Sequence, residues 1–413
     1  MATVMPVAAG KVLHINEKGR SVPLLKEGLH DLLYPPKSNL PALDVLRSAA
    51  ILLVFTGHFV GEFHARPAIQ RFAAFRWGWT GVDLFFVLSG LLIGSQLWKE
   101  LDRTGRIRIG HFLLRRGLRI WPLYYTFIAL TILANFFGRN ITDIWHDMIF
   151  ITNFSRAQIA GGWSLSTEEQ FYIITPLLLS LLAVKRPPRR LWVIPCLAIF
   201  ALVAARAWVR AHSMLPEVDL RQKLYFPIFT HADGLAVGVL LAWIMVFKKD
   251  WLRSKVISAC GVVAGLACGL AVYRASPVLW NFAALGLIYG SMELYGISSL
   301  PLPSVIRWRG FHLVSRLLFG LYLNHMIIFG FLNPPLYEWS KRGLFNFWAI
   351  YAICLVVSML VAMSTFLLIE WPFLRIRARW VDRSQRLTSR SPAAHKDRQS
   401  CRSGASKARS SDL

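Results

Sequence analysis

The stretch Leu43-Asp-Val-Leu-Arg-Ser-Ala-Ala-Ile-Leu-Leu-Val-Phe-Thr-Gly-His58 decides how the rest of the chain is interpreted. It belongs to a largely apolar run that continues to residue 63. That run has roughly the 20 residues that an α-helix needs to cross a bilayer. It therefore predicts a membrane span over residues 44–63.

Similar apolar runs recur along the whole chain. The sequence is 55% hydrophobic, which is more apolar than a typical soluble domain. The fold class that follows is all-α, a polytopic integral membrane bundle of about ten transmembrane helices. Gly81, Gly90 and Gly94 in the second run predict close helix packing. The predicted spans are about 44–63, 79–97, 117–138, 163–184, 191–211, 229–247, 256–272, 278–297, 312–332 and 346–369.

The formal net charge of +25 is explained by membrane orientation. Lys and Arg gather between the apolar runs and in the C-terminal tail. The short loops assigned to the cytoplasm carry more Lys and Arg than those assigned to the outside, which places both termini in the cytoplasm. We therefore expect a multi-pass protein of the inner (plasma) membrane, in contact with lipids and with no nucleic-acid partner.

The chain divides into three predicted regions. Residues 1–40 form a cytoplasmic N-terminal extension without a cleavable signal peptide, so the first span acts as its own signal-anchor. Residues 41–375 form the transmembrane domain. Residues 376–413 form a basic cytoplasmic tail that is predicted to be disordered and to contact anionic lipid heads.

Ionisable residues within the spans are the first candidates for a functional site, because they are costly in a membrane. Arg47 and His58 are eleven residues apart, so they face the same side of a helix and lie about 16 Å apart along its axis. Asp44 lies one turn before Arg47 and can pair with it. An anchor at the inner interface explains Asp44 as well as a functional role does. For His58, deep in an apolar run, a functional role is favoured.

Further candidates lie on both sides of the predicted bundle. Ordinary positive-inside charge explains the cytoplasmic arginines at least as well as phosphate binding does. Ser166 and Glu169 have capping-box spacing, which accounts for Glu169 but leaves Glu168 without a structural explanation. The candidates near the cytoplasm are Arg47, Arg115, Arg116 and Arg119, and those nearer the outer side are His58, Asp83, Glu168, Asp233 and His325.

This arrangement by depth suggests that the donor and the acceptor bind at different depths. A cationic inner mouth that leads to a centre of histidines and carboxylates suits a phosphorylated cytosolic donor. The acceptor would then receive the transferred group on the other side of the membrane.

Six motifs in sequence order also carry a family resemblance. Each motif alone is weak evidence, but together they resemble the acyltransferase family 3 membrane proteins, which O-acylate bacterial glycans and some small hydroxylated molecules. The resemblance covers about residues 40–375. The motifs are Arg47-x10-His58, Phe85-Phe-Val-Leu-Ser-Gly90, Arg115 and Arg119 before Ile-Trp-Pro, Trp163-Ser-Leu-Ser-Thr-Glu-Glu-Gln-Phe-Tyr172, Tyr322-Leu-Asn-His325 and Glu370-Trp-Pro-Phe373.

The resemblance implies a reaction and its substrates. The donor substrate would be cytosolic acyl-CoA, usually acetyl-CoA, and the acceptor a hydroxyl of a glycan such as lipopolysaccharide or exopolysaccharide. No bound cofactor and no metal are expected. The resemblance also implies that Arg47 and His58 are the essential pair. It further implies a stand-alone form without the C-terminal hydrolase-like domain that many relatives carry.

Our sequence-based hypothesis assigns catalysis to His58, Glu168 and Asp83. His58 would be the general base for the acceptor hydroxyl, and Glu168 or Asp83 would orient it or bind the acceptor. A covalent acyl-His58 relay is an alternative. The residues assigned to substrate and donor binding are Arg47, Arg115, Arg116, Arg119, Asp233, His325 and Tyr172.

Two other function classes stay open at this point. A proton-coupled transporter or exporter of a glycan or small metabolite could use the same buried groups, although the sequence has no repeated half. A receptor or scaffold that uses the basic tail would leave the buried charges unexplained.

Overall fold

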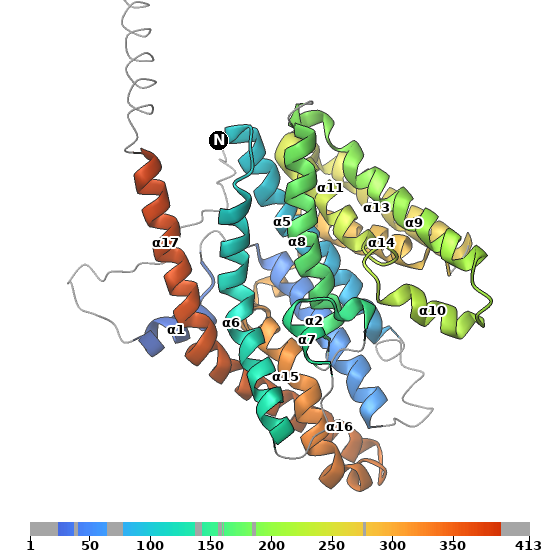
Figure 1. Ribbon diagram of the computed structural model, residues 1–413, viewed down its shortest axis with the longest axis vertical. Helices are drawn as coiled ribbons and strands as arrows, with labels where there is room; N and C mark the ends of the chain where they lie inside the picture. Colours follow the sequence, from blue (N-terminus) through green and yellow to red (C-terminus); the bar gives the residue numbers. More distant parts are fainter. Residues whose placement is uncertain are drawn as a thin grey trace, which may run out of the picture.

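In the computed structural model the described residues are 24–36, 40–63, 77–136, 143–155, 159, 161–183, 187–275 and 278–389. Within these ranges the chain forms helices and no β-strand (Figure 1). The helices of the first half are α1 (Leu24–Leu33), α2 (Pro41–Glu62), α5 (Gly81–Thr104), α6 (Ile109–Phe136), α7 (Trp145–Met148), α8 (Gly162–Ala183) and α9 (Val193–Ala211). Those of the second half are α10 (Glu217–Tyr225), α11 (Asp233–Phe247), α12 (Lys249–Arg253), α13 (Lys255–Ala275), α14 (Asn281–Ile297), α15 (Arg309–Ser340), α16 (Leu344–Thr365), the π-helical turn Phe366–Glu370 and α17 (Trp371–Ser389).

The membrane character of the chain is confirmed, whereas the number of spans stays a prediction. Among the described residues, six helical segments are long and apolar enough to cross a bilayer, so this is a multi-pass membrane protein. The other four predicted spans coincide with α6, α8, α11 and α14, which are shorter or less apolar. The six segments are Pro41–Glu62, Gly78–Thr104, Pro188–Ala211, Lys255–Ala275, Arg309–Ser340 and Leu344–Trp380.

Local sequence signals explain the ends of the two helices that matter most for the site. Pro41 starts α2, where its fixed φ suits the first turn and its missing N–H costs nothing. Helix α5 ends at Gly105, which adopts a left-handed φ of 68° while its N–H donates to the Leu101 carbonyl.

Helices α5 and α11 cross with their backbones in direct contact. A Cβ added to Gly90 would lie 2.2 Å from the Leu235 carbonyl oxygen, and one added to Gly238 would lie 2.2 Å from the Val87 carbonyl oxygen. Only glycine fits at both positions, which is typical of close crossings in membrane bundles. The close packing predicted from the glycines of the second span is confirmed.

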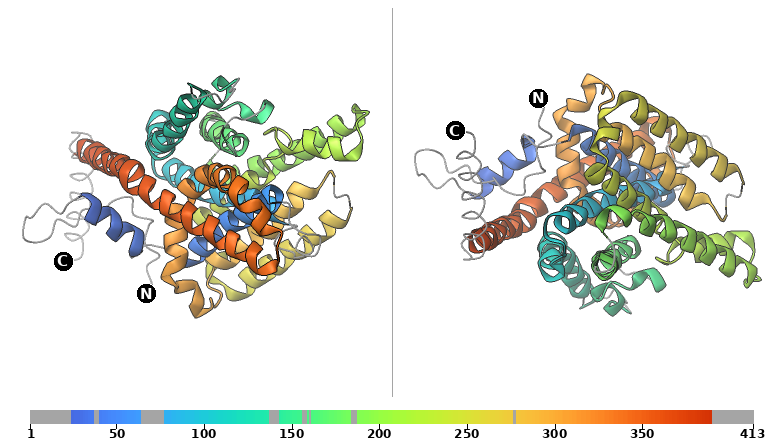
Figure 2. Two further views of the ribbon diagram at one scale, coloured as in Figure 1. Left: turned by 90° about the horizontal axis from the view of Figure 1, so that it is seen from below. Right: turned by 90° about the horizontal axis from the view of Figure 1, so that it is seen from above.

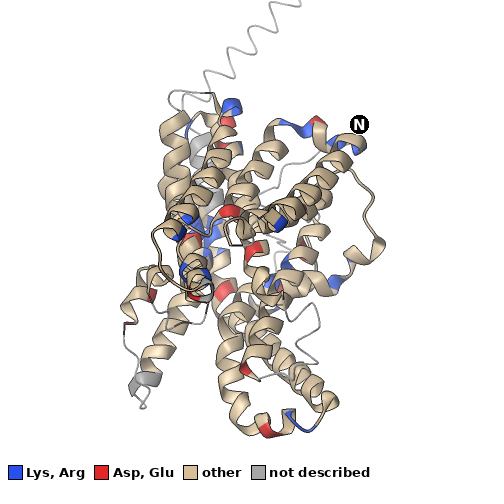
Figure 3. Ribbon diagram, turned by 90° about the vertical axis from the view of Figure 1, so that its right-hand side faces the viewer, with Lys and Arg blue, Asp and Glu red and all other residues tan. Residues whose placement is uncertain are grey.

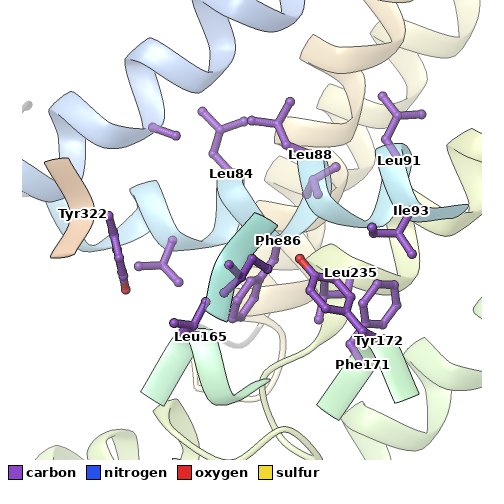
Figure 4. Close-up of a cluster of buried hydrophobic side chains, with 14 of the residues drawn as sticks. Leu84, Phe86, Leu88, Leu91, Ile93, Leu165, Phe171, Tyr172, Leu235 and Tyr322 are labelled. Carbon is purple, nitrogen blue, oxygen red and sulfur yellow. The ribbon is translucent and has the colours of Figure 1, made fainter. Parts of the chain in front are cut away.

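An apolar core surrounds this crossing and extends to α8 and α15. Figure 4 shows side chains of α5 gathered with Leu165 and Tyr172 of α8, Leu235 of α11 and Tyr322 of α15. A second cluster of buried aromatic rings, built on Phe55, Phe59 and Phe329, joins α2 to α15 and α16. These two cores hold α2, α5, α8 and α15 around the candidate site.

The first and last described helices lie together at one side of the bundle (Figures 1 and 2). The Arg375 guanidinium on α17 pairs with Glu27 on α1 at 2.8 Å. Helix α17 continues to Ser389, so the boundary predicted at residue 376 falls inside a helix. Residues 1–23 and 390–413, on which most of the predicted extension and tail fall, lie outside the described residues.

Candidate functional site

Charged residues gather about halfway along the bundle (Figure 3). There, a cavity of about 160 Å³ is lined by five arginines, which we call the arginine chamber. Because the arginines come from four helices, the chamber exists only in the folded bundle. They are Arg47 from α2, Arg116 and Arg119 from α6, Arg316 from α15 and Arg377 from α17.

Two carboxylates, Glu168 and Glu370, also line the arginine chamber. The Tyr172 hydroxyl donates to Glu168 Oε2 at 2.8 Å. The Arg116 guanidinium lies 6.0 Å from the Tyr172 ring centroid, within range of a cation–π contact. With five cations and two carboxylates, the chamber suits a ligand that carries several negative charges.

Arg47 is held in the chamber wall by a network around Asp44. Arg47 Nη1 donates to Asp44 Oδ1 at 3.0 Å, so the predicted Asp44–Arg47 pair is confirmed. The Ser315 hydroxyl donates to the same oxygen at 2.9 Å, and His312 Nδ1 lies 3.1 Å from Asp44 Oδ2. The network joins α2 to α15 and fixes where the Arg47 side chain lies.

A smaller cavity of about 70 Å³ adjoins the arginine chamber. Both cavities are lined by Phe85, Leu165 and Glu168, and the smaller one reaches Ser164 and Tyr322. The Tyr322 hydroxyl donates to the Gly161 carbonyl at 3.1 Å and shares a hydrogen bond with the Ser164 hydroxyl. The smaller cavity, which we call the passage, has a mostly apolar lining. The passage therefore suits an uncharged chain rather than a phosphate.

Tyr322, which lines the smaller cavity, lies beside a pair of histidines. The Tyr322 ring centroid lies 6.1 Å from that of His325. Nδ1 of His58 lies 2.8 Å from Nε2 of His325, and the two rings stack with an interplanar angle of 8°. His325 is fully buried, whereas His58 is exposed. The structure thus brings together two residues that the sequence analysis singled out separately.

Asp83 and Asp233 pair with residues outside the arginine chamber, and their predicted roles stay predictions. Asp83 Oδ1 lies 2.9 Å from Nε2 of His231, and neither Asp83 nor Glu168 is bonded to His58. Asp233 forms a two-pronged ion pair with Arg206 at 2.6 and 2.9 Å. These four side chains are fully buried. They stabilise the junction of α5, α9 and α11, and Asp233 does not line the arginine chamber.

The capping box predicted for Ser166 and Glu169 is wrong, and Arg115 lies outside the arginine chamber. Arg115 does not line the chamber; its Nη2 lies 3.7 Å from Glu100 Oε2. Helix α8 begins at Gly162, so Ser166 and Glu169 are past its first turn and form no capping box. The Ser166 hydroxyl bonds to that of Thr152 instead, and Glu169 accepts from the Trp121 indole at 3.3 Å.

The comparison with protein families settles which family this site belongs to. The family model described as "Acyltransferase domain" (acyltransferase 3) matches residues 40–367, which is most of the chain. The chain belongs to the acyltransferase 3 family. The match spans every residue of the arginine chamber except Glu370, Leu374 and Arg377.

Curated relatives of this acyltransferase 3 chain cover most of it. O-acetyltransferase OatA of Staphylococcus aureus (strain NCTC 8325 / PS 47) is 26% identical over 370 residues, covering 82% of this chain and 58% of the relative. Peptidoglycan O-acetyltransferase OatA of Listeria monocytogenes serovar 1/2a (strain ATCC BAA-679 / EGD-e) is 24% identical over 369 residues, covering 81% and 56%. The chain therefore spans less than three fifths of the length of these relatives. No solved structure gives a significant match.

Three residues that line the chamber of this acyltransferase 3 chain had no role predicted from the sequence. Arg316 and Arg377 were not among the predicted site residues, and Glu370 entered only through the motif Glu370-Trp-Pro-Phe373. A signal was present for Arg316, since it is an arginine inside an apolar run. The sequence had no comparable signal for Arg377, because its place in the chamber depends on the packing of α17 against α6 and the π-helical turn.

Proposed function

We propose that this protein is a membrane O-acyltransferase that moves an acyl group, most simply acetyl, from cytosolic acyl-CoA to a hydroxyl of a cell-surface glycan. The observation that carries the proposal is the arrangement of the arginine chamber, the adjoining cavity lined by Tyr322, and the His325 ring 6.1 Å from the Tyr322 ring. The family membership favours acyl transfer over the transporter alternative.

The donor fits this layout part by part. Coenzyme A carries a diphosphate and a further phosphate, and guanidinium groups bind phosphate oxygens in pairs. The pantetheine arm is uncharged and narrow, which suits the mostly apolar passage lined by Phe85, Leu165 and Tyr322. The distance of about 16 Å along α2 between Arg47 and His58 is within the reach of that arm. This assignment would bring the thioester to the histidines.

The chemistry requires a base at the acceptor hydroxyl. In the direct route, His58 takes the hydroxyl proton while the oxygen attacks the thioester carbonyl. The carbon–sulfur bond then breaks, and the proton passes to the departing thiolate. In the alternative route, His58 attacks the thioester carbonyl and the carbon–sulfur bond breaks, which releases the CoA thiolate. The acceptor hydroxyl then attacks acyl-His58, the carbon–nitrogen bond breaks, and the hydroxyl proton neutralises the thiolate. Both routes need an unprotonated nitrogen on His58.

We place the acceptor among polysaccharides exposed outside the cell membrane, such as lipopolysaccharide or exopolysaccharide. The Listeria relative is named for peptidoglycan as its acceptor, which is a further candidate of the same class. The exposure of His58, beside the buried His325, leaves it accessible to a bulky acceptor.

The test uses purified protein in liposomes with radiolabelled acetyl-CoA and separate glycan extracts. We expect release of free CoA and transfer of label to a glycan, and a loss of about a hundredfold or more in the His58→Ala variant. His212→Ala is the matched control, because His212 is an exposed histidine at the end of α9, away from the chamber. Equal activity of His58→Ala and wild type would refute the assignment of His58.

A further inference from the structure

The hydrogen bonds around His325 determine which nitrogen of His58 is free. His325 Nδ1 lies 3.0 Å from the Leu321 carbonyl oxygen, four residues earlier on α15. A carbonyl oxygen can only accept, so Nδ1 of His325 carries a proton. The remaining question is whether Nε2 of His325 carries one as well.

Burial answers that question. A doubly protonated His325 would be a cation that is fully buried, and a buried charge needs a counter-ion. Among the described residues no carboxylate bonds to either ring of the pair. The ionisable side chains around the pair are the phenols of Tyr322 on α15 and Tyr351 on α16. The carboxylate of Glu62, one turn after His58 on α2, bonds to the Asn333 amide instead. His325 is therefore neutral, with a bare Nε2.

The bare Nε2 of His325 needs a donor, and the group that faces it is Nδ1 of His58 at 2.8 Å. Nδ1 of His58 must then carry its proton, which leaves Nε2 of His58 with the lone pair. We infer that His325 is a positioning residue that holds His58 in the tautomer whose Nε2 is the reactive atom. This inference rests on the proposed function for the reaction, but the tautomer itself is a property of the resting protein.

The rigidity of the surroundings supports this role. The His325 ring packs edge-on against Phe329 at 5.6 Å and lies 6.1 Å from the Phe55 ring. The rings of His58 and His325 are nearly parallel, so rotation of either one breaks their hydrogen bond. A neutral imidazole thus does here what a carboxylate does for the histidine of a serine hydrolase, in orienting the base.

Activity measurements on two variants of one position separate positioning from packing. His325→Gln retains an amide oxygen that can accept from His58 Nδ1, whereas His325→Leu retains volume but no acceptor. We expect kcat to fall about a hundredfold in His325→Leu with the donor KM unchanged. The kcat of His325→Gln should be at least about tenfold higher than that of His325→Leu. Equal losses in both variants would overturn the inference.

The matched control is His212→Leu. His212 Nδ1 bonds to the carbonyl four residues earlier, that of Trp208, at 2.9 Å, as His325 does to Leu321, but His212 has no histidine partner. We expect wild-type kcat in His212→Leu. A hundredfold loss there would mean that removing any such helical histidine is harmful, and would overturn the positioning role.

A second measurement does not depend on turnover. Solid-state nitrogen NMR of protein with labelled histidine, in lipid and without donor, distinguishes protonated from bare ring nitrogens. We expect the resonances missing from His58→Ala to be a protonated Nδ1 and a bare Nε2. A protonated Nε2 would overturn the inference even if acyl transfer is observed. Conversely, the expected tautomer without any turnover would count against the proposed function alone.

Discussion

At the scale of single residues, the arginine chamber gathers positive charge that the protein itself only partly balances. Arg47 has Asp44 and Arg316 has Asp31 as carboxylate partners, whereas Arg116 bonds to the neutral amide of Gln96 at 2.6 Å. Anionic ligands therefore have guanidinium groups to bind. The energy of binding is concentrated in a few charge-assisted hydrogen bonds, each worth about 1.5–3 kcal/mol.

We expect Arg316→Gln to raise the KM for acyl-CoA about 10- to 100-fold with a smaller change in kcat. Arg316 lines the arginine chamber and has no part in the histidine pair, so its loss should weaken donor binding more than the chemical step. The control is Arg253→Gln, at an exposed arginine whose Asp250 partner lies 3.6 Å away. Initial rates at varied donor concentration measure both constants. An unchanged donor KM in Arg316→Gln would remove this residue from the donor site.

The sequence predicted part of the site and missed part, for identifiable reasons. The eleven-residue spacing of Arg47 and His58 is a property of one helix, so it could be read directly. The partner of His58 could not, because His325 is 267 residues away and only packing joins them. The contact of Asp83 with His231 could not be predicted for the same reason, since 148 residues separate them. Spacing within a helix is local, whereas pairing between helices is not.

At the scale of helices, the glycine crossing of α5 and α11 determines where α5, which lines the arginine chamber, lies in the bundle. Helix α5 supplies Phe85 and Ser89 to the chamber wall, and α11 holds α5 against it from the other side. The glycines of α5 suggested such a crossing in the sequence, but nothing there identified α11 as the partner.

We expect Gly238→Ala to lower the stability of the folded protein by about 1–3 kcal/mol, because its Cβ would meet the Val87 carbonyl. Gly330→Ala is the control, since a Cβ at Gly330 on α15 meets no atom within 4 Å. That change should leave stability the same or raise it slightly, because alanine favours a helix. Thermal unfolding in detergent compares the two variants. Equal melting temperatures would show that the crossing tolerates a methyl group.

Helix α1 offers a second prediction at this scale. Asp31 pairs with Arg316 of the chamber, whereas Glu27 pairs with Arg375, which does not line it. Asp31→Asn should therefore lower the donor KM about two- to fivefold by releasing Arg316, and Glu27→Gln should leave it unchanged. Titration of donor-dependent rates checks both variants. The same change in both would indicate that α1 acts only through its overall docking.

At the scale of the whole molecule, the all-helical membrane architecture followed from composition and apolar runs alone. All ten predicted spans coincide with helices, while six helical segments meet the length and apolarity needed for a span. Orientation depends on charge between the spans, and it stays a prediction. The basic helix α17 and the chamber arginines should lie toward the cytoplasm if the positive-inside rule holds.

We expect tags on both termini to be digested by protease in inside-out vesicles and protected in spheroplasts. The physical reason is that translocating the basic segments would oppose the positive-inside preference. A periplasmic marker digested only in spheroplasts serves as the control. Opposite behaviour of the two tags would require an odd number of spans and would contradict the predicted orientation.

The five arginines of the chamber have a consequence for regulation by metabolism. On the proposed assignment they hold the phosphates, and these are the same in acyl-CoA before the reaction and in free CoA after it. Binding energy directed at a shared part does not discriminate substrate from product. Spent CoA should therefore compete with fresh donor almost equally. The extent of glycan modification would then follow the ratio of acyl-CoA to CoA in the cell rather than the amount of either.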